Sequence, residues 1–374
     1  MTRPIGGTEG RTARLHAAYR ELTGSRYGCR RVANALLEAA HARLRSAYLS
    51  SLPGYVAIEV TNVCNGGCVL CPVGQGRKSR PVGFLAWDDF CRIMDQVTPS
   101  ARFVGLYNWG DPLLHPRIYD MIEYVKARNI FTKISTNLHA FRPEDAEHLV
   151  RTGLDDLAIS LHGLSEESYR AYQPRHRLAP VLENIKTIVA AKQRLGSPTP
   201  DVHLGFIVTR HNEHEVDRVP EFAAALGVGY LLEETSLNLR LLPYDRQMNL
   251  RGIDEAMLRR ERLDLANRWL PKEDSYVNRY YRYVRTHDGA LPAPGQVRFS
   301  CTAPWRQVVI CVDGDVHLCC GSFDRRHGMG NIFEEPLRQI WNNVLYRTAR
   351  RRIRGTARVS GPPVLCSDCP GMLL

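Results

Sequence analysis

The sequence contains no apolar run that is long enough to cross a membrane or to form the hydrophobic part of a secretory signal. It also contains no internal repeat and no low-complexity segment. With 44% hydrophobic residues among 374, the chain can bury a substantial core. We therefore expect a globular protein of the cytoplasm, where its eleven cysteines stay reduced unless a metal or a cluster binds them.

Acidic residues are too few to balance the basic ones, and the net charge of +11 comes mainly from arginine. The densest block is "LYRTARRRIRGTARV", with Arg347, Arg350, Arg351, Arg352, Arg354 and Arg358. Such a block is typical of a solvated helix face, or else it is a docking surface for an acidic partner. That partner could be an electron carrier, a phosphorylated substrate or a nucleic acid, and charge alone does not choose among them.

Short apolar runs alternate with amphipathic stretches from about residue 50 to residue 235. The runs predict six strands, which are "YVAIEVT" from Tyr55, "RFVGLYN" from Arg102, "IFTKIST" from Ile130, "DDLAISL" from Asp155, "VHLGFIV" from Val202 and "VGYLLEE" from Val228. The clearest helix lies between Pro180 and Gly196, where apolar residues recur at helical spacing. Parallel strands need helical crossovers, so six such units predict an α/β fold with a partial (βα)6 TIM-type barrel.

Three further regions surround this core, which we place at residues 51–240. Residues 1–50 predict a helical extension, and "RRVANALLEAAHARLRSAYL" is its strongest helical segment. Residues 241–295 predict a helical linker, followed by a small cysteine-bearing domain at residues 296–374. The linker contains "SYVNRYYRYVR", a composition typical of RNA contact or, as we favour here, of a helix that buries its tyrosines.

Three cysteines, Cys64, Cys68 and Cys71, lie in a loop directly after the first predicted strand. A structural zinc site needs four protein ligands, and this trio supplies only three. Three thiolates on a four-iron cluster leave one iron open to bind a substrate or a cofactor. The loop also lies at the edge of the barrel where such folds place their chemistry. The spacing therefore favours an open iron–sulfur cluster over a chance group of cysteines.

In this loop and in its barrel, the chain resembles the radical S-adenosylmethionine (SAM) superfamily. The resemblance implies that Cys64, Cys68 and Cys71 hold a [4Fe-4S] cluster whose open iron binds SAM. It further implies that reduction cleaves SAM to methionine and a 5'-deoxyadenosyl radical, which removes a hydrogen atom from the substrate.

Other motifs of that superfamily appear at the ends of the strands. "NWGDPLLHP" resembles its Gly-Gly-Glu-Pro turn, with Trp109 in place of the first glycine and Asp111 in place of the glutamate. Leu70 stands where relatives usually have an aromatic residue, so the adenine is expected to pack on an aliphatic surface. The resemblance implies six SAM-binding positions: Leu70, Gly110, Asp111, Ser135, Asn137 and Ser160.

A second set of cysteines lies near the C-terminus. Cys301, Gly314 and Cys319 resemble the opening of the SPASM domain, which carries auxiliary clusters in one radical SAM subgroup. A full SPASM domain has further cysteines beyond Cys366 and Cys369, whereas this chain ends five residues after Cys369. It is thus similar to the shortened "twitch" version, which implies one auxiliary [4Fe-4S] cluster on these four cysteines. Zinc is the alternative, because two cysteine pairs also form ribbon sites.

Two spare cysteines, Cys311 and Cys320, belong to the segment "VICVDGDVHLCC". Its apolar alternation around Asp313 and Gly314 predicts a hairpin, because this pair favours tight turns. We interpret both thiols as packing residues beside the auxiliary cluster. The alternative interpretation makes one of them a cluster ligand or a hydrogen-atom donor.

Two clusters together suggest a two-electron oxidation, and the dehydrogenation of an alcohol to a ketone is its simplest form. This reaction needs a base near the hydroxyl group. The candidate catalytic residues at the strand ends are Arg210, Glu233, Glu234 and Tyr107, with His162 and His211 nearby. The resemblance implies a small sugar-like or aminocyclitol-like substrate in natural-product biosynthesis, such as that of antibiotics. Radical epimerisation of a similar substrate and modification of a ribosomal peptide are the alternatives.

The expected partners are the small-molecule substrate and an acidic electron donor such as flavodoxin or ferredoxin. We expect neither a membrane nor a nucleic acid, because a nucleic-acid-binding module has no use for a three-ligand site beside a barrel mouth. The sequence does not identify the substrate, since strand-end residues can change without altering the fold.

Overall fold

The computed structural model describes residues 28–235, 237, 255–291, 301–353, 361–362 and 364–367. Its centre is a sheet of eight strands in the order β6-β5-β4-β3-β2-β1-β7-β8. Six of them confirm the predicted strands: β1 (Tyr55–Ile58), β2 (Phe103–Gly105), β3 (Phe131–Thr136), β4 (Asp156–Ser160), β5 (Asp201–Val208) and β6 (Gly229–Glu234). Neighbours among these six are all parallel, as helical crossovers require.

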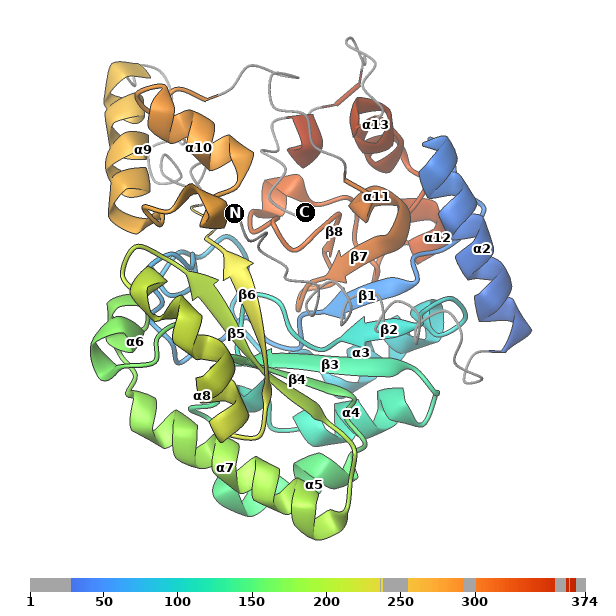
Figure 1. Ribbon diagram of the computed structural model, residues 1–374. Coiled ribbons are helices and arrows are strands. Elements are labelled where there is room, and N and C mark those ends of the chain that lie inside the picture. The colour runs from blue at the N-terminus through green and yellow to red at the C-terminus, as the bar shows by residue number, and fades with distance from the viewer. Residues whose placement is uncertain are drawn as a thin grey trace.

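Helices connect the six strands and cover one side of the sheet (Figure 1). They are α3 (Trp87–Val97), α4 (Ile118–Lys126), α5 (Ala146–Arg151), α6 (Glu166–Tyr172), α7 (Leu178–Leu195) and α8 (Val219–Ala225). Helix α7 ends as predicted because Gly196 takes a left-handed φ of 59°, which a glycine adopts without steric cost. The architecture is the predicted α/β fold, a partial (βα)6 barrel.

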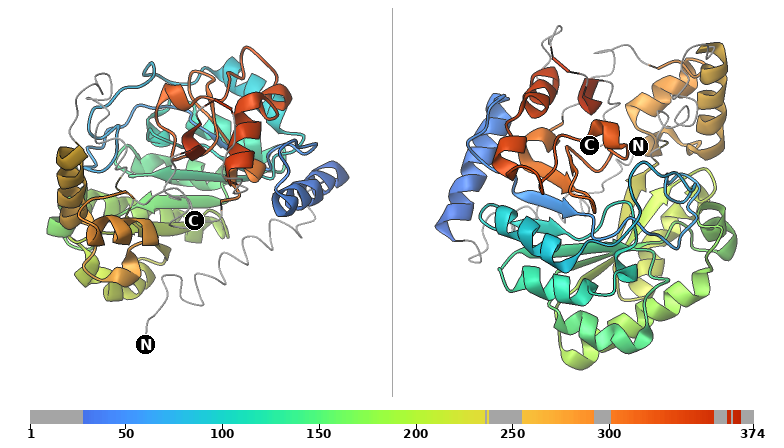
Figure 2. Two further views of the ribbon diagram at one scale, coloured as in Figure 1. Left: turned by 90° about the horizontal axis from the view of Figure 1, so that it is seen from above. Right: turned by 180° about the vertical axis from the view of Figure 1, so that it is seen from behind.

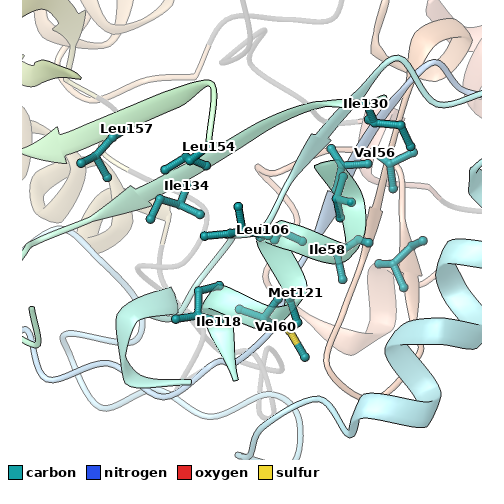
Figure 3. Close-up of a cluster of buried hydrophobic side chains, with 14 of the residues drawn as sticks. Val56, Ile58, Val60, Leu106, Ile118, Met121, Ile130, Ile134, Leu154 and Leu157 are labelled. Carbon is teal, nitrogen blue, oxygen red and sulfur yellow. The ribbon is translucent and has the colours of Figure 1, made fainter. Parts of the chain in front are cut away.

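The main hydrophobic core lies between the sheet and these helices (Figure 3). Val56 and Ile58 of β1 face Met121 of α4 across this core, and Ile134 and Leu157 continue it along β3 and β4. Because side chains alternate along a strand, the residues between them point to the opposite side of the sheet. We call that opposite side the inner face.

The chain after residue 301 extends the same sheet. Strand β7 (Gln307–Ile310) runs parallel to β1, with Val308 opposite Val56. Strand β8 (Val316–His317) pairs antiparallel with β7, which confirms the predicted hairpin. The helices α11 (Ala303–Arg306), α12 (Leu337–Ile340) and α13 (Val344–Ile353) gather around β7 and β8, away from α5 and α7 (Figures 1 and 2). Backbone hydrogen bonds between β7 and β1 therefore join the chain after residue 301 to the barrel sheet.

Helices also form in the two other predicted helical regions. Helix α2 (Cys29–Leu44) lies in the N-terminal extension, and α9 (Glu255–Trp269) and α10 (Arg279–Thr286) lie in the linker. Tyr280 and Tyr281 of α10 are buried, which confirms the interpretation that this helix buries tyrosines. The predicted domain limits at residues 240 and 295 lie outside the described residues. None of the described helices is long and apolar enough to span a membrane.

The arginine block does not form one solvated helix face. Arg350 of α13 is fully buried, and its guanidinium carbon lies 4.6 Å from the centroid of the Trp341 ring. The same guanidinium donates hydrogen bonds to the backbone oxygen atoms of Pro304 and Ala47, at 2.8 and 3.0 Å. These contacts compensate its burial. Arg347 and Arg351 are exposed, whereas Arg354 and Arg358 lie outside the described residues.

Candidate active site

The loop with Cys64, Cys68 and Cys71 follows β1 at the carboxyl edge of the sheet. A methyl group built on Gly66 would lie 3.4 Å from the Sγ atom of Cys64 and 3.6 Å from that of Cys68. These two sulfur atoms therefore face the same glycine, and a larger residue would occupy the space between them. The chain turns tightly here, since the backbone N–H of Cys71 donates to the oxygen of Cys68 at 3.1 Å.

Burial raises the pKa of the Cys64 thiol to about 11 and that of Cys68 to about 12, and it also raises the pKa of Cys71. Backbone N–H groups oppose this effect: that of Gly66 donates to the sulfur of Cys64 at 3.3 Å. A bound metal compensates such buried thiolates and deprotonates them outright.

No three Cys, His, Asp or Glu side chains of the described residues lie close enough to share a single metal ion. A four-iron cluster binds each thiolate through a different iron. The cysteine loop offers such a cluster three thiols that are not in disulfides, and the sulfur atoms of Cys64 and Cys68 both face Gly66.

The cysteine loop packs against two neighbouring parts of the chain. Leu70 is buried in a cluster with Tyr172 of α6, Trp269 of α9 and Tyr280 of α10. The backbone N–H of Val69 donates to the oxygen of Tyr172 at 3.1 Å. These contacts hold the cysteine loop against α6, α9 and α10. The expected contact between Leu70 and adenine stays a prediction.

The turn "NWGDP" packs directly on the chain that leads into the cysteine loop. A methyl group on Gly110 would lie 2.2 Å from the backbone oxygen of Thr61 and 2.8 Å from that of Val63. The backbone N–H of Asp111 donates to the oxygen of Val63 at 2.9 Å. Only glycine permits this close approach of two backbone segments. The turn and the cysteine loop therefore have a fixed mutual position.

The Asp111 carboxylate is buried and turned toward the end of β3. It accepts hydrogen bonds from the Thr136 hydroxyl at 2.9 Å, from the backbone N–H of Asn137 at 2.8 Å and from that of Leu113 at 3.0 Å. Burial raises the pKa of Asp111, and these hydrogen bonds oppose the shift. The carboxylate thus joins two of the predicted SAM-binding segments, and its direct contact with SAM stays a prediction.

Asn137 connects these segments to the cysteine loop. Its Nδ2 atom donates to the Oδ1 atom of Asn65 at 2.7 Å and lies 3.9 Å from the Sγ atom of Cys64. Nothing in the sequence pointed to Asn65, because asparagine is common in loops. Ser135 on β3 and Ser160 at the end of β4 lie on neighbouring strands, as predicted. All predicted SAM-binding positions except Leu70 therefore lie at or beside the ends of β2, β3 and β4.

Two of the candidate catalytic residues, Tyr107 and Glu233, lie on the inner face, and a methyl group built on Gly205 of β5 would lie 3.2 Å from the Oε1 atom of Glu233. Burial raises the pKa of Tyr107 to about 12, and the nearby negative groups Cys320, Asp156 and Glu233 raise it further against a hydrogen bond from Tyr55. The Tyr55 and Tyr107 hydroxyl groups are 3.2 Å apart. Tyr107 therefore keeps its proton at neutral pH and can donate a hydrogen bond.

The other two catalytic candidates lie elsewhere. Glu234 follows Glu233 on β6 and so points to the opposite side of the sheet, the side on which Leu232 packs against the main core. The backbone N–H of Arg210 donates to the oxygen of Trp269 at 2.9 Å, which places Arg210 at the junction between β5 and α9. The structure thus places Tyr107 and Glu233 on the same face of the sheet and Glu234 and Arg210 elsewhere. Of the nearby histidines, His162 is buried, and its Nδ1 atom accepts a hydrogen bond from the backbone N–H of Ile207 at 3.1 Å.

The inner face also carries a group of ionisable side chains that the sequence did not lead us to predict. The Oδ1 atom of Asp156 lies 3.4 Å from the Nζ atom of Lys133 and 3.5 Å from the Nδ1 atom of His203. Burial raises the pKa of Asp156 to about 6, although Lys133 opposes this shift. The available signal was an ionisable side chain on each of three consecutive strands, Lys133 on β3, Asp156 on β4 and His203 on β5.

Three of the four predicted auxiliary ligands belong to the described residues. Cys301 and Cys319 are buried, and Cys366 packs at the edge of the main core. The negative forms of Cys319 and Cys366 both act on the pKa of Tyr346, so these two thiols share one neighbour on α13. Cys311 is fully buried against Ala57 and Val309 on the inner face, whereas Cys369 lies outside the described residues.

Two protein-family models match the chain. The Radical SAM superfamily model matches residues 58–223, and the model of the iron–sulfur cluster-binding SPASM domain matches residues 301–370. The chain belongs to the radical SAM superfamily and has a C-terminal SPASM domain. It is therefore an enzyme that binds SAM and a [4Fe-4S] cluster, and its SPASM domain binds an additional iron–sulfur cluster.

Several characterised proteins are similar to the chain over most of its length. The tungsten-containing aldehyde ferredoxin oxidoreductase cofactor-modifying protein of Pyrococcus furiosus is 28% identical over 84% of this chain and 86% of its own. Mycofactocin maturase MftC of Mycobacterium ulcerans is 26% identical over 78% of this chain and 75% of its own. The Streptococcus suis SuiB structure shares the fold, with a TM-score of 0.55 and 15% identity over 93% of this chain and 82% of that one.

Proposed function

We propose that the enzyme oxidises a hydroxyl-bearing small molecule by two electrons on the inner face of its sheet. The observation that carries this proposal is that Tyr107 and Glu233 share the inner face, where the charges of Glu233 and of Cys320 both act on Tyr107 and a methyl group built on Gly205 of β5 would lie 3.2 Å from the Oε1 atom of Glu233. Dehydrogenation needs a hydrogen-bond donor and a proton acceptor at one carbon, and these two side chains can serve as such a pair. Sugar-like or aminocyclitol-like substrates meet this requirement.

Each residue has a separate role in this proposal. Cys64, Cys68 and Cys71 hold the SAM-binding cluster, and the residues at the ends of β2, β3 and β4 orient SAM. When bound there and reduced by one electron, SAM would supply the acceptor for one hydrogen atom of the substrate. Glu233 accepts the hydroxyl proton while Tyr107 donates a hydrogen bond to the same oxygen. Cys301, Cys319, Cys366 and Cys369 would hold an auxiliary [4Fe-4S] cluster, which would supply the acceptor for the remaining substrate electron, so that the carbon ends as a ketone.

The electron that starts the cycle is proposed to come from an acidic carrier of the flavodoxin or ferredoxin class. Two observations support it: Arg347 and Arg351 are exposed on α13, and the chain has a net charge of +11. Opposite charges of this size accelerate association at low salt.

The test is mass spectrometry of candidate substrates after anaerobic incubation with SAM and reductant. We expect product two mass units lighter than the substrate, with one 5'-deoxyadenosine formed for each. Unchanged mass in H2O with a gain of one mass unit in D2O would instead identify an epimerase, for which Cys320, whose charge acts on Tyr107, is the candidate hydrogen donor.

A second candidate function is the modification of a cofactor precursor or of a ribosomal peptide. The similarity to a cofactor-modifying protein and to a maturase, each over more than three quarters of this chain, favours it. The same incubation with a peptide or cofactor precursor distinguishes the two functions, because only one substrate class would show the mass change.

A further inference from the structure

Trp109 connects the turn before Asp111 to the SPASM domain. Its Nε1 atom donates a hydrogen bond to the backbone oxygen of Ser322 at 3.0 Å. Its ring meets the ring of Phe323 edge to face, with centroids 5.2 Å apart and planes inclined by 83°. Both contacts join segments that are more than two hundred residues apart in the sequence.

The segment that Trp109 contacts comes directly after Cys319. Ser322 and Phe323 are buried, and the backbone N–H of Ser322 donates to the oxygen of Cys319 at 3.1 Å. The Ser79 hydroxyl donates to the backbone oxygen of Phe323 at 2.7 Å. Trp109 and Ser79 thus both hold the carboxyl end of a short turn that begins at Cys319. Any movement of this turn also moves a predicted ligand of the auxiliary cluster.

The other end of the connection has little freedom to move. Gly110 packs against the backbone of Thr61 and Val63, and Asp111 is bonded to the end of β3. A tryptophan side chain has two rotatable bonds, so it transmits a displacement of its backbone to its ring tip. The glycine that relatives have at this position has no side chain and makes no such contact.

We propose that Trp109 is a positioning residue that couples SAM binding at the Gly110 turn to the placement of the Cys319–Phe323 segment. The proposal rests on the assignment of this turn to SAM. Coupling between two sites is reciprocal, so the state of the segment also changes the affinity for SAM through the same side chain. In this way the enzyme brings its auxiliary cluster into position when SAM is present.

Hydrogen exchange of the anaerobically reconstituted holoenzyme, with and without SAM and without reductant, tests the coupling. In the wild type, SAM should slow the exchange of peptides that cover residues 319–323. Trp109→Phe keeps a ring but loses one hydrogen bond, so the SAM-dependent slowing should fall by about fivefold. Trp109→Leu should abolish it.

Ser79→Ala is the matched control, because it removes a hydrogen bond to the same segment from outside the SAM turn. It should speed exchange at residues 319–323 with and without SAM, and it should keep the SAM-dependent difference. Undiminished slowing in both Trp109 variants would overturn the proposal, as would no slowing in a wild type that binds SAM in equilibrium dialysis. A wild type that binds no SAM would contradict the proposed function itself.

Discussion

The close packing of Gly110 gives the sharpest test of the site. Gly110→Ala would place a methyl carbon 2.2 Å from the backbone oxygen of Thr61, about 0.8 Å closer than side-chain carbons approach other atoms. The obstacle is backbone on both sides, so no rotamer change relieves it. Overpacking of this kind costs about 1–3 kcal/mol. Because the turn must move away from the chain before Cys64, we expect SAM affinity to fall by about ten- to a hundredfold.

Gly83→Ala is the matched control. A methyl group on Gly83 meets nothing within 4 Å, so this substitution should leave unfolding and SAM binding close to wild type. The assays are thermal unfolding and equilibrium dialysis with labelled SAM, both on oxygen-free reconstituted protein. Equal SAM affinity for Gly110→Ala and Gly83→Ala would refute the reasoning, because it would show that the turn holds no part of the SAM site.

Three further predictions concern the clusters, the base and the inner face. Cys64→Ala should abolish SAM cleavage, whereas Cys366→Ala should keep some cleavage and lose turnover, and each should lower iron content from about eight to about four per chain. Glu233→Gln should reduce product at least about a hundredfold while 5'-deoxyadenosine still forms, and an equal loss in Glu234→Gln would contradict the assignment of the base. Burial raises the pKa of Asp156 to about 6, so the folded protein holds this proton more tightly than the unfolded chain. Stability relative to Asp156→Asn should therefore fall by about 1 kcal/mol from pH 5 to pH 7, and parallel stability curves would exclude this effect.

The sequence was sufficient to predict the six barrel strands and the position of the polar strand-end residues at one edge of the sheet. Both depend on local patterns: alternation of apolar residues marks each strand, and polar residues at the strand ends mark the edge. Parallel strands bring their carboxyl ends to the same edge, so Asn137 and the cysteine loop meet although more than seventy residues separate Asn137 from Cys64. The glycine at the end of α7 was predictable for a similar local reason.

Pairing between distant segments was not predictable in this way. The alternation in "QVVI" indicates a strand, but nothing in it indicates that β7 pairs with β1 and continues the barrel sheet. The expectation of a solvated helix face was wrong for Arg350, because a block of arginines shows where positive charge lies but not which groups each side chain contacts. Its burial depends on Trp341, Pro304 and Ala47, of which Ala47 lies about three hundred residues away. The sequence likewise could not distinguish Glu233 from Glu234, since only the pairing of β6 with β5 decides which of the two lies on the inner face with Tyr107.

The substitution of tryptophan for glycine at position 109 shows why a departure from a family motif can carry information. Glycine is suited to a turn whose backbone must approach another segment, and Gly110 keeps that role here. Position 109 is therefore free to carry a side chain, and the structure directs that side chain to the turn after Cys319. Through a hydrogen bond and a ring contact there, this one side chain connects the radical SAM domain to the SPASM domain. The same reasoning predicts that Trp109→Gly restores the family motif and still weakens this enzyme, with more SAM cleaved per product formed.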